Sequence, residues 1–325
     1  MTKEFKEAAQ QLEQKEEIKE PKISFQILYH SHRTAKDIEK LAEIFPKIDI
    51  YIPERHAWTP EFLTDLQSLS RGEKTPQELN YEYGYSEGSP WAKRFEIIYQ
   101  SQKPILFADL GAGHELEDMY DQSKGLYRLS FYKFRSGEFQ RALQMMRNYI
   151  IKFAEYILAR EEIIKTNLET RIQELVKNNS RLEDKKEIKV LLSLGSAHTR
   201  LYRSLKKESP STIQQFSNLP TIFMSEGEAI RRAMFSKEVK DELLAKIFIE
   251  DPLYNHLIQI IDDSDKVLRA LQKMTAKISL DEIKDLSENW TDEQSGGLPL
   301  ILRKFFENKG IKIPETEKEI DEMLT

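Results

Sequence analysis

Histidines follow two short apolar runs of the sequence, and histidine can act as an acid, a base or a metal ligand. The run 190–194 leads to His198, and the run 23–28 leads to His30 and His32. A largely apolar run such as 190–194 is typical of a buried parallel strand, and 23–28 is expected to be another short strand. Ligands of open α/β sheets bind beyond the carboxyl ends of the strands. The two strand ends therefore predict one shared site.

Two carboxylates and a hydroxyl are expected at the same edge. Glu54 follows a third strand-like run, 48–52, and Asp109 follows a fourth, 104–108. Because parallel strands joined by helices end on one side of a sheet, Glu54 should leave the sheet beside the histidines. Asp109 either joins them or caps the helix that comes next. Thr199 is a candidate for contact with a substrate.

One long helix carries polar residues where its apolar stripe should continue. The helix is predicted over 138–176, because apolar residues recur there at steps of three, four or seven. Continuing this alternation places Arg160 and Asn167 on the inward face. A buried guanidinium is costly unless it meets a carboxylate, a carbonyl or an anionic substrate. Alternatively, Ile163 continues the stripe and Arg160 points to solvent.

The predicted strands and helices that position these residues indicate an α/β fold. We expect a central, mainly parallel sheet flanked by helices, with a helical C-terminal extension. The predicted division is a charged N-terminal arm over 1–20, an α/β domain over 21–224 and a helical region over 225–325. A further strand is expected at 221–224, and a turn at 251–252 should separate two helices.

Other residues that attract attention have simpler explanations. The aromatic stretch 81–91 either forms a lid over a substrate or pins a loop to the body. The stretch 125–135 is expected to be a packed connector with basic tips. The glycines at 111–113 lack the third glycine of a dinucleotide-binding fingerprint. His256 lies among apolar residues of a predicted helix and is expected to be structural.

Composition excludes several classes of protein. The chain has 325 residues, of which 39% are apolar and 32% charged, and a net charge of −6. That size and apolar content support a substantial core, and the acidic balance argues against a nucleic-acid partner. Cysteine is absent, so disulfides, thiolate nucleophiles and cysteine-based metal sites are excluded. No run of about 18 apolar residues occurs, and the first residues lack a secretory leader, so we expect a cytoplasmic protein without membrane contact.

The order and setting of four short motifs resemble the TraB/Tiki family, within the wider erythromycin-esterase/ChaN-like superfamily. An early strand ends in a Gly-x-x-His motif, a second ends in a Glu motif, a long helix carries an Arg-acidic pair, and a late strand ends in a second Gly-x-x-His. The resemblance spans about residues 22–206 and rests on Tyr29-His30-Ser31-His32, Pro53-Glu54-Arg55, Arg160-Glu161 and Gly195-Ser196-Ala197-His198.

This chain departs from the family pattern at one position. Tyr29 stands where the first motif has glycine, and tyrosine requires a different turn. Either His32 or His30 can then reach the pocket, and His30 is a candidate for substrate contact together with Asn167 and Thr199.

The resemblance implies a pocket built from the two histidine motifs and the glutamate. Tiki proteins resemble metal-dependent proteases that use manganese- or cobalt-like ions, and zinc is a further possibility. His32, Glu54 and His198 would be the ligands of a divalent ion that lowers the pKa of bound water. Arg160 would hold an oxyanion or orient Glu54. The general base would be Glu161 or Asp109.

The resemblance also implies a metal-free alternative. In the erythromycin-esterase pocket, histidine acts as a base towards water while glutamate and arginine position it. We therefore expect a hydrolase of an amide, peptide or ester, acting on a small molecule or a peptide with or without a metal. Two rivals are a non-catalytic ligand-binding or regulatory protein on the same scaffold, and an interaction module that works through its helical tail.

Overall fold

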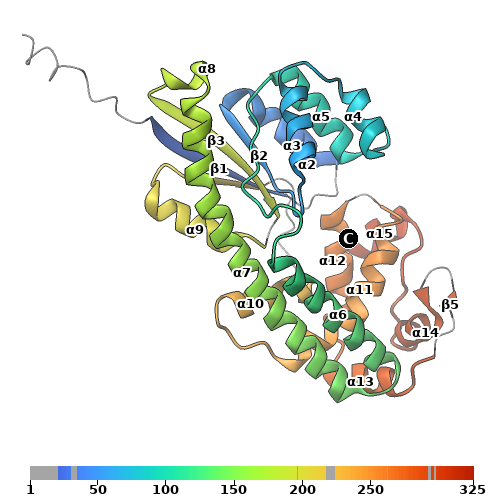
Figure 1. Cartoon of the computed structure of the whole chain (residues 1–325). Helices are drawn as coiled ribbons and strands as arrows, with labels where there is room; N and C mark the ends of the chain where they lie inside the picture. Colours follow the sequence, from blue (N-terminus) through green and yellow to red (C-terminus); the bar gives the residue numbers. More distant parts are fainter. Residues whose placement is uncertain are drawn as a thin grey trace, which may run out of the picture.

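The computed structural model describes residues 21–30, 35–195, 197–216, 224–261, 263–291, 294–295 and 298–325. It confirms the α/β fold: a four-stranded, all-parallel sheet has helices on both faces, and a helical region follows (Figure 1). The predicted N-terminal arm lies outside the described residues. Among the described residues, no helix combines the length and the apolar character needed to cross a membrane.

The sheet has the strand order β2-β3-β1-β4. These strands are β1 (Lys22–His30), β2 (Ile50–Pro53), β3 (Glu187–Gly195) and β4 (Ile213–Phe216). The apolar runs form strands because alternate side chains are buried on opposite faces: Ile27 and Tyr29 join the hydrophobic cluster on one face, and Leu28 joins the cluster on the other. In the register of β1 and β3, His30 pairs with Gly195, so the two strands end together.

One predicted strand is wrong, and one strand of the sheet was not predicted. The segment 104–108 makes a single parallel bridge, between Ile105 and Tyr51, and is not a full strand. Its later carbonyls are taken instead by side chains of a helix, as described below. β4 was not predicted, because Gln214 and Gln215 interrupt its apolar character. The predicted strand at 221–224 lies outside the described residues apart from Met224, which immediately precedes a helix.

Helices cover each face of the sheet (Figure 1). The helices α2 to α5 build the cluster on the face that contains Leu28, and the second half of α7 packs with α9 on the opposite face. Their bounds are α2 (Ala35–Ile44), the 3-10 helix η1 (Phe45–Lys47), α3 (Pro60–Ser70), α4 (Pro76–Tyr83), α5 (Pro90–Ser101), α7 (Phe139–Lys177), α8 (Ser180–Glu183) and α9 (Thr199–Glu208).

The aromatic stretch 81–91 joins α4 to α5 through Gly84, whose left-handed conformation (φ 67°) ends α4. Tyr85 stacks on Trp91 with ring centroids 6.0 Å apart, and Trp91 lies 5.7 Å from Phe95. These contacts pin the stretch to the body, which is the second of the two roles expected for it.

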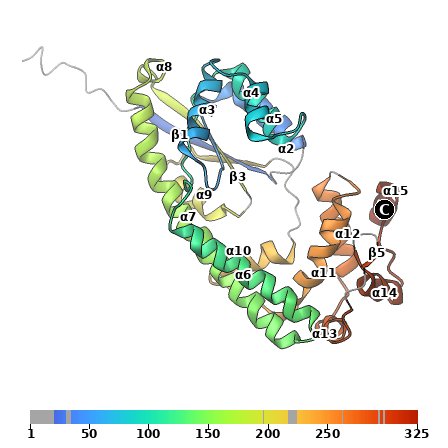
Figure 2. The ribbon, with the colours of Figure 1, turned by 45° about the vertical axis from the view of Figure 1, so that its right-hand side comes forward.

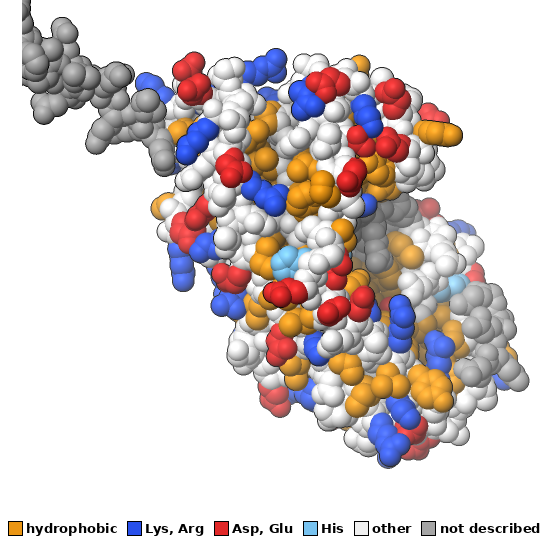
Figure 3. All heavy atoms as spheres, in the orientation of Figure 1, with side chains coloured by type: hydrophobic (Ala, Val, Ile, Leu, Met, Phe, Trp, Pro, Cys, Tyr) orange, Lys and Arg blue, Asp and Glu red, His pale blue; other side chains and the backbone are white. Residues whose placement is uncertain are grey.

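The helix α7 runs through two separate cores. Its second half packs on the sheet, whereas its first half packs with α6 (Leu116–Arg135) and the C-terminal helices (Figure 2). The expected connector 125–135 is therefore the second half of a helix. We call α6, the first half of α7 and α10 to α15 the helical lobe, and the remainder the sheet lobe. In the view of Figure 3, the surface of the molecule is hollowed between the two lobes.

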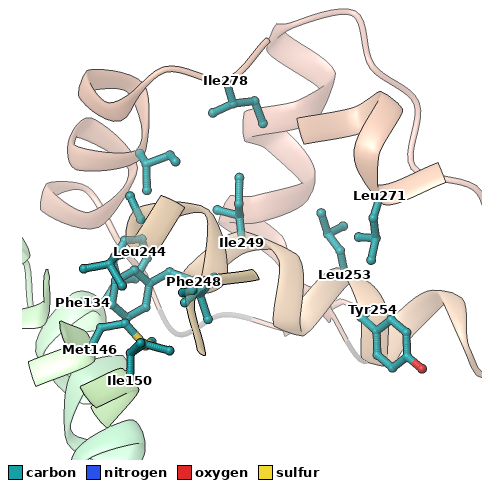
Figure 4. Close-up of a cluster of buried hydrophobic side chains, with 14 of the residues drawn as sticks. Phe134, Met146, Ile150, Leu244, Phe248, Ile249, Leu253, Tyr254, Leu271 and Ile278 are labelled. Carbon is teal, nitrogen blue, oxygen red and sulfur yellow. The ribbon is translucent and has the colours of Figure 1, made fainter. Parts of the chain in front are cut away.

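The C-terminal part of the helical lobe is built around α11, whose side chains pack against α7 and α12 (Figure 4). The turn predicted at 251–252 is wrong, because Pro252 lies inside α11. The helix continues since Phe248, Ile249 and Leu253 are buried in one core on both sides of the proline. The elements of this part are α10 (Ser225–Met234), α11 (Asp241–Leu257), α12 (Ser264–Thr275), α13 (Leu280–Glu288), β5 (Gln294–Ser295), β6 (Leu298–Pro299), α14 (Leu300–Asn308) and α15 (Glu317–Leu324).

His256 has the structural role expected of it. It is 8% exposed, and its Nε2 lies 3.2 Å from the carbonyl oxygen of Pro314, so it ties α11 to the segment before α15. The division of the chain at residue 224 stays a prediction, because packing alone does not show which parts fold independently.

Candidate functional site

The candidate site lies at the carboxyl edge of the sheet, where β2 and β3 end side by side. Pro53 pairs with Ser193 in the register of these strands. The backbone N–H of Glu54 extends the ladder by donating to the Ser193 carbonyl over 2.8 Å. After β3 the chain turns, and His198 immediately precedes α9. Parallel pairing therefore brings Glu54 and His198 to one place.

Arg160 lies inward on α7, at the position that the apolar stripe predicts, and it is only 6% exposed. Its Nε donates to Asp109 Oδ1 over 2.7 Å, and its Nη2 donates to Glu54 Oε1 over 2.8 Å and also to Asp109. Nη1 has no hydrogen-bond partner among the described residues. One guanidinium thus joins two carboxylates and keeps one nitrogen uncommitted.

Glu54 also meets His198 and the backbone of β3. His198 Nε2 lies 3.2 Å from Glu54 Oε1, and the backbone N–H of Gly195 donates to Glu54 Oε2. On the other side of the ring, His198 Nδ1 lies 3.5 Å from Glu161 Oε1. That separation is too long for a well-formed hydrogen bond, so the contact is an electrostatic attraction.

The electrostatics keep His198 charged. Burial lowers the pKa of His198, but the charge of Glu54 and the contacts with both glutamates outweigh burial and raise the pKa to about 9. His198 is therefore an imidazolium at neutral pH, with both ring nitrogens as donors. Asp109, Arg160, Glu54, His198 and Glu161 form a row of alternating charge, which we call the charge chain.

Glu54 is the most exposed member of the charge chain. Its side chain is 13% exposed, whereas those of Asp109 and His198 are 3% and 1% exposed. Charged groups are rarely buried so deeply unless they are paired, and clusters of this kind at the edge of a sheet are typical of functional sites.

The predicted substrate contacts have other positions. Asn167 lies inward, but its Nδ2 donates to the Ala108 carbonyl over 2.9 Å, and Arg171 Nη1 donates to the Phe107 carbonyl over 2.6 Å. Both side chains hold the segment before Asp109. The Oδ1 of Asp109 also accepts from the N–H of Leu110 over 2.8 Å. Asp109 does not cap the following helix, because α6 begins at Leu116 and the residue before it, Glu115, provides no side-chain cap. Of the two roles expected for Asp109, the structure therefore shows the one at the edge of the sheet.

The structure describes the remaining predicted site residues only in part. Thr199 is the first residue of α9, and its Oγ1 is buried without a hydrogen-bond partner among the described residues. His30 ends β1 beside Gly195, and its side chain is not described. His32 lies outside the described residues.

Tyr29 has a clear role in this structure. Its ring is 1% exposed in the core of the sheet lobe, and its hydroxyl donates to the His198 carbonyl over 2.9 Å. Tyrosine at this position therefore fastens the turn that carries His198 to the neighbouring strand.

Sequence reasoning missed His56 and Tyr156. The ring of His56 lies 6.1 Å from the ring of Tyr156, and burial together with the charge of Arg160 lowers the pKa of His56. Burial is also the main cause that raises the pKa of Tyr156 to about 12, with contributions from Asp109 and Glu54. Spacing was the available signal: His56 is two residues after Glu54, and Tyr156 is one helical turn before Arg160.

The described residues do not fit a divalent metal ion. In these parts of the chain, no three His, Asp or Glu side chains converge in a way that would hold one. Glu54 accepts from Gly195 and from Arg160, whose positive charge only 2.8 Å away would repel a cation. Both nitrogens of His198 face carboxylates. Glu54 and His198 are thus committed to the charge chain.

Comparisons of this chain with family models, with curated proteins and with solved structures found no match. The resemblance to the TraB/Tiki family therefore stays a prediction that rests on the four motifs. The function has to be argued from the geometry of the charge chain.

Proposed function

We propose that this protein is a hydrolase that cleaves an ester or amide bond, including a peptide bond, at the outer end of the charge chain. The observation that carries the proposal is Arg160, which is buried, fixes Glu54 and keeps Nη1 uncommitted beside it. A carboxylate next to an available guanidinium N–H can direct water at a carbonyl group and stabilise the charge that develops. The proposed substrate is a small molecule or a peptide in the cytoplasm.

In the proposed reaction, the Glu54 carboxylate holds a water molecule against the carbonyl carbon. Glu54 takes a proton from the water as its oxygen bonds to that carbon, and Arg160 Nη1 donates to the carbonyl oxygen as it gains negative charge. The bond to the leaving oxygen or nitrogen then breaks, and the leaving group takes up the proton from Glu54. No step requires a metal ion.

The other members of the charge chain act as positioning residues. Asp109 binds two nitrogens of Arg160 and so fixes the plane of the guanidinium. His198 and the N–H of Gly195 hold both oxygens of Glu54, and Glu161 balances the charge of His198. We prefer these roles for Asp109 and Glu161 over that of general base, because each is only 3% exposed.

The same burial favours one alternative, a ligand-binding protein that does not turn its ligand over. Four members of the charge chain are at most 6% exposed, as are many purely structural ion-pair clusters. In that case Glu54 would bind a donor group of the ligand, and Arg160 Nη1 an acceptor group.

The experiment is a hydrolysis assay of the full chain against a panel of esters and amides, in a metal chelator and again with added manganese. We expect turnover in chelator that is lost in Arg160→Lys, because lysine cannot reproduce the fork that joins Asp109 and Glu54. Arg141→Lys is the matched control, since Arg141 lies on the same helix and is 75% exposed. Turnover that appears only with manganese contradicts the metal-free proposal, and absence of any turnover supports the alternative.

A further inference from the structure

An aromatic surface borders the charge chain on the side of the helical lobe. The ring of His56 lies 5.2 Å from Tyr120 of α6, and Tyr120 lies 5.4 Å from Tyr156 and 6.2 Å from Phe153, both of α7. We call these four residues the aromatic wall. His56 and Tyr156 interact electrostatically with Arg160, Asp109 and Glu54, so the aromatic wall lies beside the proposed reaction centre.

Lys124 covers the aromatic wall in part: its Nζ lies 5.5 Å from the ring centroid of Tyr120 and 5.3 Å from that of Phe153. His56, Tyr120 and Phe153 each keep part of their surface exposed, whereas Tyr156 beneath them is buried. The rings are tilted against one another, by 41° between His56 and Tyr120 and by 48° between Tyr120 and Phe153. Partly exposed aromatic rings of this kind can take a further flat group by stacking or by edge-to-face contact.

One polar atom of the wall lacks a partner. His56 Nε2 is shielded from solvent and has no hydrogen-bond partner among the described residues. A shielded polar atom without a partner is destabilising, so such an atom in a native structure calls for an explanation. A polar atom of a bound ligand would supply the missing hydrogen bond.

We infer that the substrate carries a flat apolar group beside the scissile carbonyl, that this group lies on Tyr120 and Phe153, and that a polar atom next to it bonds to His56 Nε2. The class is thus an aromatic or conjugated ester or amide rather than one with a flexible aliphatic chain. This inference rests on the proposed function, because it names the substrate class of the same site.

The experiment measures binding separately from turnover. Isothermal titration calorimetry compares 2-naphthamide, which is flat, with octanamide, which is flexible. We expect 2-naphthamide to bind more tightly and Tyr120→Leu to weaken its binding about 3- to 10-fold, while the affinity for octanamide changes less than about 2-fold. His56→Phe should weaken the binding of 2-naphthamide as well, because it keeps a ring and removes Nε2.

Phe131→Leu is the matched control, because Phe131 lies on α6 as Tyr120 does but packs against Tyr127 and Phe248. It should leave both affinities unchanged, and circular dichroism confirms that each variant is folded. The inference is overturned if neither amide binds, if octanamide binds as tightly as 2-naphthamide, or if Tyr120→Leu weakens both alike.

Hydrolysis of ethyl 2-naphthoate and ethyl octanoate by the same proteins separates the two proposals. Preference for the naphthoate that Tyr120→Leu removes supports both. Selective binding of 2-naphthamide without hydrolysis of any ester or amide in the panel leaves the aromatic wall as a ligand site and rejects the hydrolase. Hydrolysis without any dependence on Tyr120 retains the hydrolase and rejects the inferred substrate class.

Discussion

Arg160 is held in place by two buried carboxylates. It lies between Asp109, which it binds through two nitrogens, and Glu54, whose charge it shares with His198. Moving two carboxylates out of water costs several kcal/mol each, and their attraction to the guanidinium offsets that cost only while the pairing is intact. The residue is therefore as important for the stability of the site as for its chemistry.

The first prediction concerns stability at this residue. Arg160→Met keeps an apolar stem but leaves Asp109 buried without a cation and Glu54 with His198 alone, so we expect the free energy of unfolding to fall by about 3–5 kcal/mol. Arg141→Met removes an exposed ion pair with Glu138 and should cost at most about 1 kcal/mol. Urea denaturation of both variants is the measurement. Equal losses would show that the charge chain is not a coupled cluster.

Residue types and spacing predicted much of the site. The contacts that they did not predict have physical explanations. The inward position of Arg160 follows from its place in an apolar stripe, since an arginine there has to find carboxylates. The role of Tyr29 in fastening His198 depends on a contact between residues 169 apart in sequence, which spacing does not reveal. His56 was missed although it is only two residues after Glu54, because its ring contacts come from Tyr120 of α6 and Tyr156 of α7, which are distant in sequence.

At the scale of elements, the N-terminus of α10 is capped by a side chain of another helix, α11. Met224, which precedes α10, provides no side-chain cap. Glu250 of α11 accepts instead, from the N–H of Ser225 over 2.7 Å and from its hydroxyl over 2.9 Å. Glu250 is 7% exposed, and burial raises its pKa even though these hydrogen bonds act in the opposite direction.

The second prediction follows from that raised pKa. An acid whose pKa is higher in the folded than in the unfolded protein favours folding fully below the unfolded value, and this contribution is lost as pH rises through the folded pKa. Stability should therefore decline as pH rises from about 4.5, the ordinary value for glutamate, through the raised pKa of Glu250.

Glu250→Gln cannot titrate, so its stability should vary less over this pH range than that of the natural protein. The measurement is urea denaturation at several pH values, with Glu242→Gln, on the same helix but in its exposed first turn, as the control. Parallel curves for Glu250→Gln and the natural protein would contradict the prediction.

The periodicity of apolar residues predicted the elements whose buried faces follow a regular pattern in the sequence. β3 and α7 have long, unambiguous apolar patterns, and both were located to within a few residues. β4 carries two glutamines, and α11 contains a proline that tertiary packing overrides. The segment 104–108 has the composition of a strand, but Asn167 and Arg171 take its carbonyls in place of a neighbouring strand.

At the scale of the whole molecule, α7 links the two lobes. Its 39 residues contribute Met146 and Ile150 to the core of the helical lobe, and Ile164 and Leu168 to the core of the sheet lobe. The charge chain lies between these two sections of the helix, at Arg160. Loss of either core would therefore remove packing that the same helix needs in the other.

The third prediction is that both lobes unfold in one transition. Tryptophan fluorescence can follow each lobe, because Trp58 and Trp91 pack in the sheet lobe and Trp290 packs against Phe134 in the helical lobe. The variants Trp290→Phe and Trp58→Phe/Trp91→Phe each leave only one lobe with a reporter. We expect their urea transitions, each compared with circular dichroism of the same variant, to coincide. Separate transitions for the two lobes would contradict it.

The α/β class and the helical C-terminal region could be predicted from the sequence, because alternating strand and helix patterns constrain them. The composition of the helical lobe could not. α6 and the first half of α7 precede β3 in sequence, yet they share a core with helices that follow residue 224. Amphipathic patterns show which face of a helix is buried but do not identify the partner that buries it.

The central claim is that Glu54 directs a water molecule at a carbonyl group, and one kinetic comparison tests it most directly. The measurement is kcat/KM of Glu54→Gln on the best substrate of the panel, in chelator. The control is Glu138→Gln, because Glu138 immediately precedes α7 at the end remote from Arg160 and its side chain is 32% exposed. Glutamine keeps the size of the side chain and its acceptor for Arg160 but cannot take a proton. We predict a loss of about 100-fold or more for Glu54→Gln and no change for Glu138→Gln. Activity of Glu54→Gln within a few fold of the natural protein would contradict the account.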